Sequence, residues 1–195
     1  MGMFNLVLAT SLVHSRTRPI VASADVFGLG ECRQQLLEAL RIQDKNPAKT
    51  EEIIALHAES IVPLEERIFL PDVPLDERKE MVVAVARSLD FIEEAVSGPM
   101  LAGSRCTAAD ASLFPSIALF EQTLVPHFGW TPWTDEAMFY RRPRLHAWRE
   151  LMQYEQAAVQ VEEQLANKLK ALNWDDLAVE VPTSRLRKFP SHTSG

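Results

Sequence analysis

The sequence lacks several features that would assign it to a functional class. It has only two cysteines, Cys32 and Cys106, too few for a disulfide framework, so we expect a reducing, cytoplasmic location. Acidic residues outnumber basic ones by 27 to 20, which argues against a general nucleic-acid-binding protein. No apolar run approaches the roughly 18 residues of a transmembrane helix, so no membrane span is predicted.

Motifs for metals and nucleotides are also missing. The five histidines are scattered, without the His-Glu-x-x-His pattern of zinc enzymes. The segment "GLGECR" at Gly28 lacks the third glycine and the preceding strand of a dinucleotide loop. His57 lies in "HAE" without the Cys-x-x-Cys that would complete a deaminase zinc site. We therefore expect no bound metal and no nucleotide cofactor, and interpret His57 as an ordinary helix residue.

The first 24 residues contain no acidic residue, two arginines and five hydroxyl residues. This composition resembles an organelle transit peptide, so a chloroplast or mitochondrial location is the alternative to the cytoplasm. A strand at residues 4–9 followed by a polar loop is the simpler interpretation.

Apolar residues from residue 28 onward recur at helical spacing. We predict an all-α bundle of five to seven helices over residues 28–172, between an N-terminal extension (1–27) and a polar, basic tail (173–195). Pro63 should end one helix, and Pro143 should begin another in its first turn. The expected helices start near Glu31, Thr50 (as the cap), Leu75, Thr107 and Pro143, with a last one after a break near Glu155.

Thr107 and Asp110 open an apolar segment that contains Pro115. Thr-x-x-Asp has the spacing of a capping box, in which the two side chains satisfy backbone N–H groups at a helix start. The flanking alanine, leucine and phenylalanine residues predict that this helix start is buried. We therefore assign Asp110 a folding role in preference to a catalytic one.

The segment "LAGSRCTAADASLFPSI" resembles the C-terminal helical domain of glutathione transferases. In that family a Thr/Ser-x-x-Asp pair begins a central buried helix, and a later helix carries a tryptophan, matched here by Trp148. The resemblance covers about residues 50 to 170 and implies structural roles for Thr107, Asp110, Pro115 and Trp148.

The resemblance does not extend to the part of the family that performs chemistry. Glutathione is bound by an N-terminal thioredoxin-like domain, and 27 residues are too few for its strands and helices. Ser11 and Ser15 are the only candidates for the serine that activates glutathione. The chain is therefore expected to be a truncated or alternatively spliced member, with glutathione as its cofactor only if it is an enzyme.

Two functions remain open. The first is non-catalytic binding of an apolar ligand or a protein; the alternative is an active glutathione transferase that conjugates glutathione to apolar electrophiles. The candidate substrate-binding residues form an aromatic group, for which a loop-packing cluster is the commoner interpretation: Phe128, Trp130, Trp133, Phe139 and Tyr140.

A surface that relatives bury against the thioredoxin-like half should need another cover here. We expect a second copy, and hence a homodimer, or else a protein partner or the chain's own N-terminal 27 residues and tail. The apolar residues expected on this face are Ile53, Ile54, Ile61, Ile68, Phe69 and the Trp130–Trp133 loop.

Overall fold

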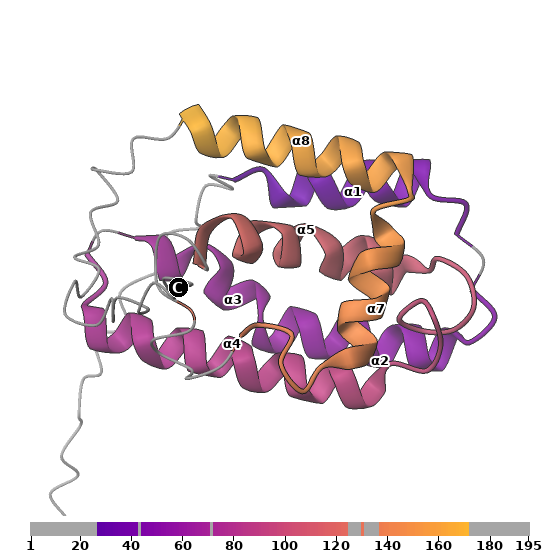
Figure 1. Cartoon of the computed structure of the whole chain (residues 1–195), viewed down its shortest axis with the longest axis horizontal. Helices are drawn as coiled ribbons and strands as arrows, with labels where there is room; N and C mark the ends of the chain where they lie inside the picture. The colour runs from indigo at the N-terminus through magenta and orange to yellow at the C-terminus, as the bar shows by residue number, and fades with distance from the viewer. Residues whose placement is uncertain (1–26, 43, 71, 125–129, 131–136, 172–195) are drawn as a thin grey trace, which may run out of the picture.

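The computed structural model describes residues 27–42, 44–70, 72–124, 130 and 137–171 (Figure 1). This part of the chain is all-helical, as predicted, and contains no strand. Its elements are α1 (Leu29–Ala39), α2 (Pro47–Ser60), α3 (Val62–Glu65), the 3-10 turn η1 (Arg67–Phe69), α4 (Leu75–Ala95), α5 (Ala108–Thr123), α7 (Pro143–Met152) and α8 (Gln156–Ala171).

The helices form three layers with α5 in the middle (Figure 1). On one side α1 and α8 lie next to each other and both contact α5. On the other side α2 packs against both α5 and α4, while α7 crosses the layers and contacts α4. Helix α5 is consequently buried on nearly every side, which explains why its residues are apolar all round rather than on one stripe.

Helix α2 begins earlier than predicted. Asn46 is its N-cap, with the side-chain oxygen accepting from the backbone N–H of Lys49, and Pro47 occupies the first turn. Thr50 is a buried residue of the first turn and not the cap, so that prediction was wrong. Both residue types favour the cap position, but a proline at the first helical position makes Asn46 the better start.

The other helix boundaries agree with the sequence pattern. Pro63 lies in the first turn of the short α3, after α2 has ended at Ser60. Helix α4 spans Leu75–Ala95, and Pro143 opens α7. The predicted strand at 4–9, residues 1–26 of the N-terminal extension and the predicted tail lie outside the described residues.

Most of the described residues of the expected apolar face are buried in this structure. Ile53, Ile61 and Ile68 have no exposed surface, and Phe69 is 1% exposed. Phe27, just before α1, packs edge-on against Phe69 with ring centroids 5.2 Å apart. These residues therefore belong to the chain's own core, and their exposure can no longer be the reason to expect a partner.

Candidate functional site

Asp110 is the centre of a buried hydrogen-bond hub at the start of α5. Its Oδ2 atom accepts from the Thr107 backbone N–H at 2.7 Å and from the Thr107 hydroxyl at 2.9 Å. Its Oδ1 atom accepts from the Leu101 backbone N–H at 3.0 Å and from Trp148 Nε1 at 2.8 Å. The predicted capping box is present, and the same carboxylate also joins α5 to α7 and to the preceding turn.

The turn before α5 positions Leu101 for this hub. Met100 and Gly103 exchange backbone hydrogen bonds, and the tight turn brings Gly103 against Gly98. A Cβ atom on Gly98 would lie 2.3 Å from the Gly103 carbonyl oxygen, so no larger residue fits at position 98. The turn aims the Leu101 N–H into the protein, where Asp110 accepts it.

Burial dominates the electrostatics around the hub. It raises the pKa of Asp110, despite the four donors that favour the ionised carboxylate. Burial also raises the pKa of the half-buried Cys106 thiol to about 12, with added repulsion from Asp110 and Glu155. Cys106 is therefore protonated at neutral pH, and the thiolate that reacts with electrophiles is scarce.

A second polar cluster lies between α2, α3 and α5. His57, Glu65 and Ser116 are at most 2% exposed. His57 Nε2 lies 2.8 Å from Ser116 Oγ and 3.3 Å from Glu65 Oε1. The Ser116 hydroxyl donates to Glu65 Oε1, and Ser112 Oγ lies 3.0 Å from His57 Nδ1.

Arg33 of α1 completes this cluster, which we call the His57 cluster: Arg33, His57, Glu65, Ser112 and Ser116. Arg33 Nη2 contacts both Glu65 oxygens at 2.6 Å, and Arg33 Nε donates to the Ser112 carbonyl oxygen at 3.2 Å. Burial alone would raise the pKa of Glu65, but the His57 hydrogen bond, the Arg33 charge and the Ser116 hydroxyl outweigh it and lower that pKa. Glu65 is therefore an ionised carboxylate inside the protein.

The His57 cluster was not predicted from the sequence. A serine pair at 112 and 116, one helical turn apart on an otherwise apolar helix, was an available signal. The partners His57 and Glu65 lie on opposite sides of the break at Pro63. The contact between them depends on that bend and on the packing of α2 against α5. The spacing of apolar residues in the sequence does not predict either feature.

The three aromatic candidates that the structure describes differ widely in their exposure. Trp130 is fully buried, Phe139 packs partly buried against the core, and Tyr140 is 55% exposed. The Arg141 guanidinium lies 5.3 Å from the Tyr140 ring centroid. Phe128 and Trp133 lie outside the described residues, as do Ser11 and Ser15.

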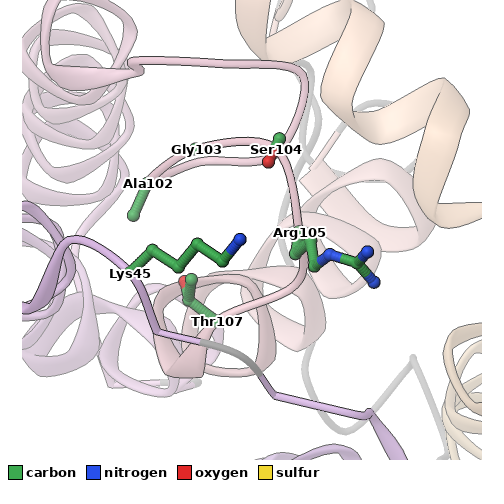
Figure 2. Close-up of a pocket in the computed structure, with 6 residues that line it drawn as sticks. All are labelled: Lys45, Ala102, Gly103, Ser104, Arg105 and Thr107. Carbon is green, nitrogen blue, oxygen red and sulfur yellow. The ribbon is translucent and has the colours of Figure 1, made fainter.

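A hollow lined by Lys45, Ala102, Gly103, Ser104, Arg105 and Thr107 lies beside the hub (Figure 2). Its volume of about 20 Å³ holds little more than one water molecule. In Figure 2 Lys45 extends across the hollow, whereas the guanidinium of Arg105 points away from it. No group of histidine, cysteine or acidic side chains within the described ranges is arranged to hold a metal ion.

Comparison with known proteins supports the family resemblance over one part of the chain. Residues 75–151 match the protein family described as "Glutathione S-transferase, C-terminal domain". This segment, from the start of α4 to Leu151 of α7, is similar to a glutathione S-transferase C-terminal domain, and the all-helical fold agrees with that similarity. No match was found among curated proteins or among solved structures.

The match runs from the long helix α4 through the Asp110 hub to Trp148. No thioredoxin-like sheet occurs among the residues that the structure describes. None of the helices formed by those residues is long and apolar enough to cross a membrane.

Proposed function

We propose that this chain acts as a binding module without glutathione transferase activity and that its ligand is a protein rather than a small apolar molecule. The main support is the placement of the described aromatic candidates, because Trp130 is fully buried whereas Tyr140 is 55% exposed. The residues matched to the family belong to its C-terminal domain, whereas glutathione is bound by the thioredoxin-like domain of family members. The described residues contain no thioredoxin-like sheet, so we assign none of them to glutathione binding.

The outer face of α7 is the surface that best fits this role. Pro143, Ala147 and Leu151 follow one another at four-residue intervals, so they lie along one side of the helix. All three are exposed. Tyr140 and Tyr154, which are 55% and 86% exposed, lie just beyond the two ends. We call these five residues the α7 stripe.

The opposite side of α7 accounts for the folding role of the helix. Leu145, Trp148, Arg149 and Met152 are buried against the protein. Because those residues already anchor α7, folding of this chain does not require the α7 stripe to be apolar. Exposed tyrosines flanking an apolar surface resemble the residue composition of protein interfaces, where tyrosine contributes strongly to binding.

A second copy of the chain is our proposed partner. The α7 stripe carries no charged side chain, so it does not demand an oppositely charged partner. A two-fold dimer applies the same patch to both subunits, and an uncharged apolar stripe can pack against itself without pairing like charges. This proposal keeps the homodimer but moves its interface from the buried α2 and η1 residues to α7.

Sedimentation velocity across a concentration series tests this interface. We expect the wild-type chain to associate, and Leu151→Glu to remain monomeric because a charge would be buried in each subunit. Leu75→Glu is the matched control, since Leu75 is 37% exposed, as is Leu151, and lies on α4 fifteen residues before Asp90, which pairs with Arg142 at the start of α7. A monomeric wild type at every concentration, or equal loss of association in both variants, would contradict the proposal.

The family match also favours one alternative, an active glutathione transferase. Incubating the full chain with glutathione and an aryl halide separates the two functions. We expect no conjugation above the rate of the variants Ser11→Ala and Ser15→Ala. Turnover that either substitution abolishes would establish the enzyme instead.

A further inference from the structure

The His57 cluster contains a continuous hydrogen-bonded chain from a half-buried serine to a buried carboxylate. The Ser112 hydroxyl meets His57 Nδ1 at 3.0 Å. On the other side of the ring, His57 Nε2 lies 2.8 Å from Ser116 Oγ and 3.3 Å from Glu65 Oε1. A nucleophile on one ring nitrogen and a carboxylate at the other is the arrangement by which serine enzymes activate a hydroxyl.

The partners of the ring decide which nitrogen carries the proton. The Ser116 hydroxyl already donates its hydrogen to Glu65 Oε1, so its oxygen is left to accept from His57 Nε2. A neutral imidazole with hydrogen on Nε2 has its lone pair on Nδ1. That lone pair faces Ser112 Oγ, as abstraction of the serine proton requires.

We propose that Ser112 is an activated serine that accepts small acyl groups from activated esters. Its Oγ atom attacks the ester carbonyl carbon while its proton passes to His57 Nδ1. The bond from that carbon to the leaving oxygen then breaks, and the leaving alcohol takes the proton from Nδ1. A water molecule repeats the sequence, releases the carboxylic acid and restores the Ser112 hydroxyl. This activity is separate from the binding role assigned to α7.

Charges in the cluster suit this step. Glu65 lies beside His57 and would stabilise the imidazolium that forms when Nδ1 takes the proton. Arg33 holds both Glu65 oxygens, and its Nε donates to the Ser112 carbonyl. The guanidinium therefore lies beside the residue that would be acylated, where its positive charge would favour a negative oxygen on the bound ester. Ser112 and His57 would touch the reacting atoms, whereas Glu65 and Ser116 are positioning residues.

The surroundings limit the substrate to small groups, because Ser112 is half-buried inside α5. The backbone N–H groups of α5 bond within the helix, so they cannot stabilise an oxyanion. Arg33, whose side chain is 20% exposed, is the described cation that contacts both Ser112 and the interior of the cluster. A short acyl or phosphonyl group is therefore the suitable probe.

Labelling of the full chain with a small alkyl fluorophosphonate tests the proposal. The Ser112 oxygen–phosphorus bond forms, the phosphorus–fluorine bond breaks, fluoride leaves and the proton goes to His57 Nδ1. Mass spectrometry should place the label on Ser112. The control Ser104→Ala, which removes an exposed serine, should leave labelling unchanged, while His57→Gln should slow it about 100-fold.

A thiol variant keeps the test valid if His57→Gln fails to fold. In Ser112→Cys, iodoacetamide should modify position 112 well before Cys106, which serves as an internal reference because burial keeps its thiol protonated. Circular dichroism of each variant verifies the fold. The proposal is overturned if the folded wild type is not labelled at Ser112, if Ser104 reacts as fast, or if Cys106 is alkylated before position 112.

Discussion

Replacing Asp110 with alanine tests the central claim about how this domain is held together. The substitution removes the acceptor for three buried N–H donors, from Leu101, Thr107 and Trp148, and for the Thr107 hydroxyl. Asp110 itself has no exposed surface, so water cannot replace the carboxylate. The helix start, the preceding turn and α7 lose their common partner together.

The expected loss follows from the number of donors and from the burial of the charge. An orphaned buried donor costs about 1–3 kcal/mol, so three N–H groups could cost considerably more than one lost cap. Burial also raises the pKa of Asp110, which means that the ionised carboxylate is disfavoured inside the protein and its removal recovers part of the loss. We expect a net destabilisation of about 3 kcal/mol, compared with about 1 kcal/mol for Thr107→Ala.

Urea unfolding monitored by circular dichroism measures this loss. With a urea dependence of about 2 kcal/mol per molar, the midpoint should fall by about 1.5 M at an unchanged slope. Asp110→Asn is the matched control, because it keeps the shape and one acceptor oxygen, and it should lie between wild type and alanine. A loss below about 1 kcal/mol for Asp110→Ala would refute the hub as the main link between α5 and α7.

Three further predictions concern the other charged groups and the thiol. Arg149, which is buried and bridges Glu121 and Glu162, should cost about 2–3 kcal/mol when replaced by alanine, whereas Arg67→Ala at an exposed pair should cost less than about 1 kcal/mol in thermal unfolding. The pKa of Glu65 is lowered on folding, so ionised Glu65 stabilises the folded chain above its ordinary pKa, and this stabilisation is lost as pH falls through the folded pKa. The difference in unfolding free energy between wild type and Glu65→Gln should therefore narrow on acidification. A difference that does not change with pH would contradict this assignment. Alkylation of Cys106 followed by mass spectrometry at pH 8 should be slow in the folded chain and rapid in urea.

Much of the fold could be predicted because its signals are local. Pro143 starts α7 since its ring suits the first helical turn and its missing N–H has no partner there. The Thr107–Asp110 spacing predicted the start of α5 for a similar reason, as both side chains act within one turn. The start of α2 was predicted wrongly because Asn46 and Thr50 are both residue types that cap helices. Pro47, which follows Asn46, favours Asn46 as the cap.

The sites were harder to predict than the helices. The Thr-x-x-Asp spacing predicted the capping box of Asp110, but the bonds of Asp110 to Leu101 and Trp148 join residues up to 38 positions apart. His57 was interpreted as an ordinary helix residue, although it meets Ser116 across 59 positions. Pairings of this kind depend on how helices cross, and helix crossing is governed by side-chain packing that no single segment contains.

The sequence by itself determined the longer helical segments, the cap of α5 and the burial of the start of α5, because these follow from hydrophobic period, proline and short-range hydrogen bonding. Only the tertiary structure decided which polar side chains meet inside the protein. Arg33, His57, Glu65 and Ser116 come from four different helices, and each is tolerable in the interior only because the others satisfy it. These contacts form only after α1, α2 and α3 have packed on α5, so the spacing of residues in the sequence does not predict them.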